Sequence, residues 1–250
     1  MNTPLLPQTN RTGKRIMSLS FFAACALSLA TVVPARAGTA PILDLRASNG
    51  EIVDASKAAR LLKTPRAETT PDGSISITGE AAISIPYGEG DRLFQSGPFT
   101  WIIKAKFKSP AALTDDQVYG LFWRWNYKNE RSVCLQLYQG HTLSFLISAD
   151  GGLESLSFVS LPVEVVPPDE WVTFVCRFDP GKRMSVELYD RNNELLKMVE
   201  KTKGVPEAFF AESNVDFNLG TPEALGYSIG RIQVWDECLP DEEIPALLGK

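Results

Sequence analysis

The sequence has few of the residues from which metal sites and nucleophilic centres are built. It contains four cysteines and a single histidine among 250 residues. No cysteine or histidine spacing resembles a zinc site. His141 lies in a Gln-Gly-His-Thr turn, which is typical of an exposed hairpin residue rather than a general base. Without a second histidine or a recognisable Ser or Cys partner, nucleophilic catalysis has no support in the sequence.

The acidic residues also lack a cluster that would suit a cation. Hard cations need several oxygen ligands that converge on one point. The candidate carboxylates are spread over separate predicted loops; they are Asp44, Asp54, Asp115, Asp116 and Asp150. We predict that these are solvated loop carboxylates. The sequence therefore predicts no metal site and no cofactor.

The N-terminus has the pattern of a secretory signal. Three basic residues within positions 11–15 precede an almost entirely apolar or small run, 19–33, and Ala35-Arg36-Ala37 supplies an A-x-A cleavage site. This pattern predicts a signal peptide over residues 1–37 and a mature domain over residues 38–250. It also predicts a secreted or periplasmic protein.

Three alternatives for the leader stay open. Met17 is a second candidate start, because the segment from there to Ala37 is itself a compact signal. A membrane anchor is less favoured, since the apolar run is shorter than the ~20 residues that span a bilayer. A lipoprotein signal ending at Cys25 is a minor alternative, because much of the apolar run follows that cysteine. Cleavage predicts no membrane insertion of the mature chain.

The charge of the mature chain excludes two kinds of partner. The leader holds four of the 25 Lys and Arg and none of the 30 Asp and Glu, so residues 38–250 have a formal charge of −9. Nucleic acids and anionic membrane surfaces both require a basic patch. We therefore expect neither as a partner.

Three cysteines remain after cleavage, at positions 134, 176 and 238. An oxidising compartment would allow one disulfide, in any of three pairings, with one spare thiol. Three unpaired cysteines are the alternative. Strand alternation places Cys176 on an apolar face with Phe174, whereas Cys134 points away from the apolar face that holds Leu135. These opposite orientations disfavour a bridge between Cys134 and Cys176.

Short runs of alternating apolar residues dominate the mature chain. Trp171–Phe178, Met184–Tyr189 and Leu195–Val199 are separated by polar turns, a pattern that predicts the hairpins of an antiparallel sheet. Further strands are expected at 41–45, 74–77, 81–85, 99–107, 118–125, 132–138, 142–148, 156–159, 215–219 and 227–235.

Little helix is expected beside these strands. A helical turn is compatible with residues 54–63 and a short helix with 241–248, and the Pro-rich residues 161–168 are expected to form a crossover loop. About a dozen regularly spaced strands with almost no helix, no internal repeat and no linker predict one all-β domain. The expected architecture is a two-sheet antiparallel β-sandwich, or jelly roll.

Three segments, in this order, carry a family resemblance. Phe99–Phe107 resembles a strand of the form FT-x-x-x-W-x-K, although here the Trp directly follows the Thr. Glu170–Asp179, followed by Val186–Tyr189, resembles W-x-x-V-x-x-x-Y-D and V-x-L-Y-x-N-G, and Ile229–Ile244 resembles a closing I-D-E-V-R-I-Y-N-R-A-L-S-x-E-E-I motif. The chain thus resembles the laminin G-like, concanavalin A-like jelly-roll domains of secreted bacterial proteins.

The resemblance implies a binding fold that recognises glycans or proteins, often with calcium at the edge of the sandwich. The acidic pair of the closing motif falls here on Gly230 and Arg231, which puts calcium in doubt. Glycosidases need two facing carboxylates, and related glucanases carry them as E-x-D-x-x-E, which does not occur. Glu187 stands alone on its strand and Glu154 follows a Gly-Gly turn. A diverged glycoside hydrolase or lyase is therefore only a weaker alternative.

An aromatic segment supplies the candidate ligand-binding residues. Strand alternation places Trp123, Trp125 and Tyr127 on one face, with Arg124 and Asn126 on the other. Rings next to Arg and Asn donors suit sugars, whose apolar faces stack on rings while their hydroxyls take hydrogen bonds. The plainer alternative, which we favour, is that both tryptophans are core residues that face the second sheet. Three further tryptophans match structural positions of the family and are expected in the core: Trp101, Trp171 and Trp235.

The functional expectation is a secreted, non-catalytic binding module for carbohydrate. The alternative partner is an extracellular protein, which would make the chain an interaction or scaffolding domain. The oligomeric state is left open by the sequence.

Overall fold

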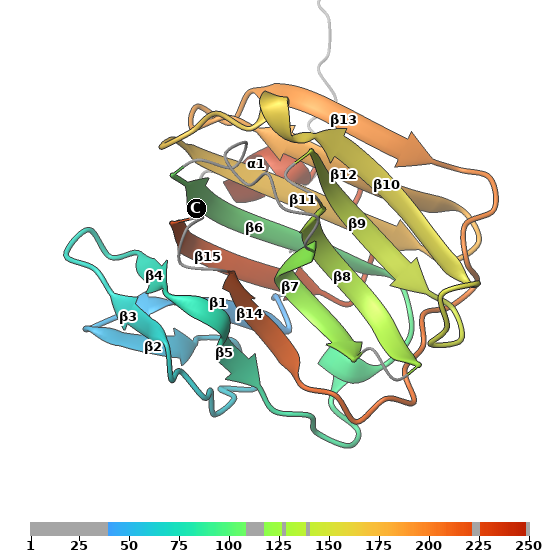
Figure 1. Ribbon diagram of the computed structural model, residues 1–250, viewed down its shortest axis with the longest axis horizontal. Coiled ribbons are helices and arrows are strands. Elements are labelled where there is room, and N and C mark those ends of the chain that lie inside the picture. The colour runs from blue at the N-terminus through green and yellow to red at the C-terminus, as the bar shows by residue number, and fades with distance from the viewer. Residues whose placement is uncertain (1–39, 109–117, 127–128, 139–140, 222–225, 249–250) are drawn as a thin grey trace, which may run out of the picture. The chain divides into compact units, whose positions relative to one another are not determined.

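The computed structural model describes residues 40–108, 118–126, 129–138, 141–221 and 226–248 (Figure 1). The expected signal peptide, Asp115, Asp116 and Tyr127 lie outside these residues. The described domain belongs to one compact unit, Thr39–Lys250. Its described residues contain no helix with the length and apolar character needed to cross a membrane.

Two antiparallel sheets form the domain, as the alternating pattern predicted. The larger sheet has the order β13 (Leu195–Lys201), β12 (Arg183–Tyr189), β11 (Trp171–Asp179), β6 (Phe99–Phe107), β15 (Tyr227–Trp235), β1 (Leu43–Ser48) and β2 (Glu51–Asp54). Beyond this path, β4 (Ile75–Ile77) pairs with β15 and with β3 (Ala67–Thr69). The smaller sheet has the order β10 (Leu156–Pro162), β9 (Thr142–Ser148), β8 (Glu130–Tyr138), β7 (Val118–Asn126), β14 (Phe217–Thr221) and β5 (Gly79–Ile85).

Most expected strands are confirmed within two or three residues at their ends. The sequence missed β2 and β3, which are short and only partly buried. The helical turn expected over 54–63 is wrong: the segment is a turn that ends in a bridge from Lys63 to Ser84. Residues 161–168 were expected to form a crossover loop. The first two of them instead end β10, and one 3₁₀ turn, η3 (Val163–Val165), follows. Another 3₁₀ turn, η1, spans Arg92–Phe94, and the helix expected at the C-terminus is α1 (Ile244–Leu248).

Aromatic rings fill the space between the two sheets. Trp101 from the larger sheet contacts Phe122 from the smaller one, with ring centroids 4.6 Å apart, and Phe122 stacks on Phe217 at 5.0 Å. Cys176 is fully buried in the same core, as its strand face predicted. Large rings of this kind contribute much of the apolar area that holds a sandwich together.

A second, smaller cluster covers the outer face of the larger sheet. Residues Leu239, Ile244 and Leu248 of the C-terminal segment pack there on β6, β11, β12 and β15, and Figure 1 shows α1 on the side of this sheet away from β7–β10. Trp235 belongs to this cluster rather than to the main core. Trp171 is only partly buried, under the ammonium of Lys106 at 5.2 Å, so the expectation of a core position is wrong for this residue.

Two of the five carboxylates that were predicted in loops, Asp44 and Asp54, are buried and accept hydrogen bonds from other residues of the protein. Asp44 pairs with Arg231, with Nε–Oδ1 at 2.6 Å and Nη2–Oδ2 at 2.8 Å. Asp54 accepts the backbone N–H groups of Asp44, Ser56 and Arg60 at 3.0–3.1 Å. The prediction of solvated side chains is therefore wrong for both, because their donors come from other strands or from a turn that the pattern did not reveal. Asp150 is exposed, as expected.

The Asp54 contacts predict an acid dependence of stability. Burial tends to raise the pKa of Asp54, but the hydrogen bonds from Asp44, Ser56 and Arg60 lower it on balance. Because the folded pKa lies below the unfolded value of ~3.9, the stabilisation is complete above about pH 4 and is lost as the pH falls through the folded pKa. In thermal unfolding between pH 2 and 7, the Tm gap between wild type and Asp54→Asn should narrow below about pH 4. Exposed Glu89→Gln is the control, and a constant gap would contradict the prediction.

Cys134, Cys176 and Cys238 are unpaired. Cys134 and Cys176 lie on different faces of different sheets, since only Cys176 belongs to the main core. The opposite orientations inferred from the alternation are thus confirmed.

Candidate functional site

The two outer faces of the sandwich differ in what covers them. The only α-helix that the described residues form, α1, packs on the larger sheet. The smaller sheet instead carries solvent-exposed rings on its outer face, with Phe158 58% and Tyr138 42% exposed. This outer face of β5, β14 and β7–β10 is the candidate site.

The middle strand of this sheet, β7, presents its tryptophans outward. An extra residue, Leu121, shifts the register between Gly120 and Phe122, so that Leu121 and Phe122 are both buried. Arg124 then points inward, while Trp123 and Trp125 are partly exposed and belong to neither core cluster. The pairing with β8 shifts once more between Arg124 and Trp125. The predicted division of faces is confirmed for Trp123, Arg124 and Trp125, and the favoured expectation that the two tryptophans face the second sheet is wrong.

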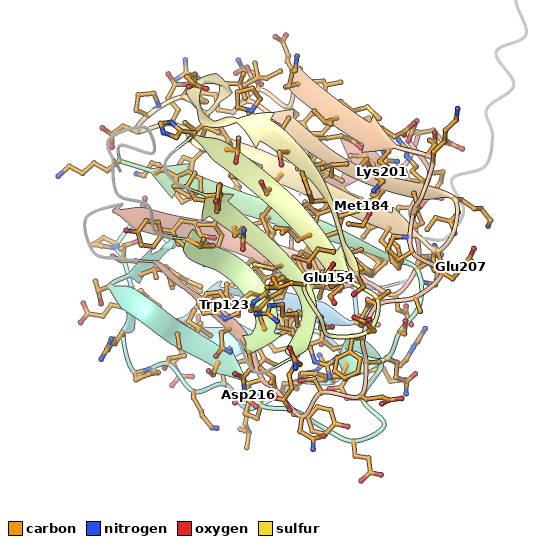
Figure 2. All side chains as sticks on the ribbon, turned by 45° about the vertical axis from the view of Figure 1, so that its right-hand side comes forward. Trp123, Glu154, Met184, Lys201, Glu207 and Asp216 are labelled. Carbon is orange, nitrogen blue, oxygen red and sulfur yellow. The ribbon has the colours of Figure 1, made fainter. Side chains whose placement is uncertain are left out.

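Gly120 makes room for the indole of Trp123. A Cβ added to Gly120 would lie 2.5 Å from Cε3 and 2.6 Å from Cδ2 of the ring, closer than any real contact. The six-membered ring therefore lies against the glycine backbone on the outer face. Figure 2 labels Trp123 on this sheet.

Trp123 stands in a row of directly paired residues that crosses the whole sheet. We call this set the aromatic row; in strand order it consists of Ser84, Asn218, Trp123, Cys134, Leu146 and Phe158. Directly opposite residues of an antiparallel pair point to the same face, with Cβ atoms about 4.5–5.5 Å apart. Ser84 donates its hydroxyl to Oδ1 of Asn218, and Asn218 donates its amide to the carbonyl of Asp216 at 3.1 Å.

Arg124, a predicted ligand-binding residue, is buried and cannot reach a ligand on the outer face. It is 0% exposed and donates to the carbonyls of Phe94 at 3.0 Å, Ala211 at 2.9 Å and Val215 at 3.4 Å, and also to that of Ser213. Burial lowers its pKa to about 10. The prediction is corrected because these carbonyls come from distant loops whose approach to β7 leaves no local pattern.

The other predicted residues lie at the end of β7. The ring of Trp125 contacts the guanidinium of Arg131 at 5.6 Å. Asn126 donates its amide to Oε2 of Glu130 at 2.8 Å. Tyr127 lies outside the described residues. The structure therefore brings Trp123 and Trp125 to the same outer face, with Asn126 beside the turn that follows.

Several residues of this face were not predicted, above all Phe158, Asn218 and Ser84. In β10 the alternation places Phe158 with Leu156 and Ser160 on the outer face, while Val159 and Leu161 belong to the core. Both faces of that segment hold apolar residues, so the alternation did not say which one is exposed. Asn218 and Ser84 come beside Trp123 only through pairings between strands far apart in the sequence.

Of the two carboxylates weighed for the enzyme alternative, Glu187 is engaged within the protein. Glu187 is buried, bonded to Arg177, and accepts the hydroxyl of Tyr189 at 2.7 Å. Glu154 and His141 are exposed, as expected for His141. Within the part of the chain that the structure describes, no group of three or more His, Cys, Asp or Glu side chains could hold a metal ion.

Two hollows of the described residues lie away from Trp123. One of about 480 Å³ is lined by residues of β2 and β3, including Glu51, Ile52 and Glu68. Another of about 340 Å³ lies beside Pro41, Lys57 and Arg60.

Comparisons with known proteins place the fold. No family model matches the chain, and neither does any curated protein. The fold is similar to that of botulinum neurotoxin binding domains. The serotype D binding domain matches with a TM-score of 0.66 at 10% identity, over 84% of this chain and 50% of that one. The ligand binding domain of the same serotype, in complex with N-acetylneuraminic acid, gives 0.64 at 10% identity over the same shares.

A third neighbour is the binding domain of Paraclostridial Mosquitocidal Protein 1, with a TM-score of 0.62 at 11% identity over 84% of this chain and 52% of that one. The chain spans about half the length of these neighbours. At such low identity the likeness shows the fold alone, a β-sandwich of the kind found in binding domains, and it does not single out the laminin G-like type.

Proposed function

We propose that the protein is a secreted or periplasmic, non-catalytic carbohydrate-binding module of the laminin G-like type, whose ligand stacks on Trp123. The observation that carries the proposal is the partly exposed indole seated over Gly120, with the polar side chains of Asn218 and Ser84 in the same row. A ring flanked by hydroxyl and amide groups can take both the apolar face and the hydroxyls of a sugar.

Two further observations support this proposal. The leader pattern over residues 1–37 is that of an exported chain. A neurotoxin domain of similar fold has been solved with N-acetylneuraminic acid, which makes carbohydrate a reasonable ligand class for a sandwich of this kind. Fold alone does not determine function, so Trp123 and its neighbours have to carry the argument.

A protein-interaction domain is the second candidate, and the edge strand β13 favours it. Leu195, Leu196 and Met198 are 52%, 46% and 37% exposed on this strand, which pairs with β12 on one side and is the last strand of its sheet. An exposed apolar edge can receive a strand from a partner. Lys197 and Lys201 on the same strand are the kind of charged residues that discourage such pairing.

A glycan array tests the first proposal. The folded unit from residue 38 onward is screened with calcium and with a chelator, and Kd values are measured for the glycans retained. Trp123→Ala should weaken binding about tenfold or more, since it removes the stacking surface. Gly120→Ala should also weaken it, because the new Cβ would displace the ring.

Trp171→Ala is the matched control, because Trp171 is also partly exposed but lies on the larger sheet. This variant should bind as the wild type does. Absence of binding to any glycan in both conditions would move the assignment to the protein-interaction domain. If Trp123→Ala bound glycans with wild-type affinity, Trp123 would not belong to the binding site.

A further inference from the structure

The aromatic row is long enough to hold more than one sugar. Trp123 and Phe158 are separated by three strand spacings, since Cys134 and Leu146 stand between them on β8 and β9. At about 4.8 Å for each spacing, the two rings lie about 14 Å apart. Cys134 and Leu146 are almost fully buried, so they form an apolar floor between the partly exposed ring of Trp123 and the exposed ring of Phe158.

A second row, parallel to the first, supplies hydrogen-bonding groups. This polar row consists of Gly120, Gln136, Ser144 and Ser160, which are directly paired across β7–β10. Ser144 is buried, with its hydroxyl 2.7 Å from that of Ser160, so the accessible polar groups of this row are those of Gln136 and Ser160. Serine hydroxyls and the glutamine amide can both donate and accept, as the hydroxyls of a sugar do.

Neither row contains a charged residue. The charged residue nearest in register is Lys63, which bridges Ser84 at the β5 end of the aromatic row. Glu130 and Arg131 follow at the end of β8, where Arg131 contacts Trp125 and Glu130 accepts from Asn126. At the β5 edge, Lys63 is paired with Asp216 at 3.5 Å. Between Trp123 and Phe158, where neither row holds a cation, an acidic sugar would have to be desolvated without a facing positive charge, which is unfavourable. The formal charge of −9 over residues 38–250 also disfavours binding of an acidic sugar, because like charges repel.

We infer that the ligand is a neutral oligosaccharide that lies across the strands from Trp123 to Phe158, with one sugar on each ring and its hydroxyls along the polar row. This inference rests on the carbohydrate-binding function proposed above. It adds the chemical class of the ligand, its direction across the sheet and a second stacking residue, Phe158.

Calorimetric titration with oligosaccharides of increasing length tests the inference. Neutral series built on glucose, xylose or mannose, from mono- to hexasaccharide, are compared with sialylated oligosaccharides of matched length. Affinity for at least one neutral series should rise with length until the chain bridges both rings. Phe158→Ala should lower the affinity for the longest oligosaccharides about tenfold and leave the affinity for the shortest unchanged. Trp123→Ala should lower the affinity for both.

A charge placed in the polar row tests the ligand class separately. Ser160→Asp should lower the affinity for neutral oligosaccharides severalfold and should not create affinity for acidic ones. Leu153→Ala is the control for Phe158→Ala, because Leu153 is a similarly exposed apolar residue, 61% against 58%, outside both rows. It should bind as the wild type does.

The outcomes separate this inference from the function on which it rests. If sialylated chains bind in a Trp123-dependent way and neutral ones do not, the ligand class is wrong while the carbohydrate function stands. If affinity is independent of length and Phe158→Ala matches wild type, the path across the strands is wrong. If no carbohydrate binds at all, both fail.

Discussion

Replacing Arg124 with alanine is expected to lower the free energy of unfolding by about 3–5 kcal/mol. The fully buried guanidinium donates to four carbonyls, that of Phe94 and three within residues 211–215, and it lies over the ring of Phe94 at 5.1 Å. Its removal leaves these acceptors without their donor and opens a cavity beside β7. Urea unfolding followed by tryptophan fluorescence measures the loss.

Two variants make this prediction specific. Arg124→Lys should recover only a small part of the loss, because an ammonium cannot match the planar fork that spans carbonyls from separate loops. Arg191→Ala, at an exposed position, should change the free energy of unfolding by less than about 0.5 kcal/mol. If Arg124→Ala kept wild-type stability but lost carbohydrate affinity, the structural role would be wrong. Arg124 would then contact the ligand directly, as the sequence predicted.

The sheet architecture was predictable because alternation is a local property. Each strand of β11–β13 shows it within its own residues, and the polar turns between them fix the hairpins. The same property gave the division of β7 into a face with Trp123 and a face with Arg124. It failed at β2 and β3, where few buried side chains leave no period to detect.

The chemical character of the two β7 faces was not predictable in this way. An arginine next to tryptophans suggests a ligand contact, yet Arg124 faces inward because loop carbonyls from residues 94 and 211–215 converge on it. Two tryptophans in an alternating strand suggest the core, yet they face outward because Leu121 adds a residue to the strand and Phe122 takes the inward position. Both errors arise from contacts between residues far apart in the sequence.

The candidate site likewise depends on distant pairings. Ser84, Trp123, Phe158 and Asn218 become neighbours in one row only when β5, β7, β10 and β14 take their places in the sheet. The sequence alone does not give the order and register of the strands, so it does not show that these residues are neighbours. The part of the site that could be predicted was thus the single strand in which its central tryptophan lies.

The second large effect is expected on the opposite sheet, at the buried pair of Arg177 and Glu187. Arg177 is 1% exposed, bonds to Glu187 and Asp241, and donates to the carbonyl of Leu239 at 3.1 Å. Burial tends to lower the pKa of Arg177, but the carboxylates of Glu187 and Asp241 raise it on balance, so the guanidinium stays charged. Glu187→Ala or Arg177→Ala alone should therefore cost about 3–5 kcal/mol, because each leaves a buried charge without its main partner.

The double variant Arg177→Met/Glu187→Leu should lose much less than the sum of the two single losses, because apolar side chains of similar size leave no buried charge. Hydrogen exchange should separate the two functions of Arg177. Since its guanidinium also holds the carbonyl of Leu239, the amides of residues 239–248 should exchange faster in both Arg177 variants than in Glu187→Ala. Neither substitution lies near the aromatic row, so binding at Trp123 should persist wherever the domain stays folded. Additive losses in the double variant would show that the two side chains act independently of each other.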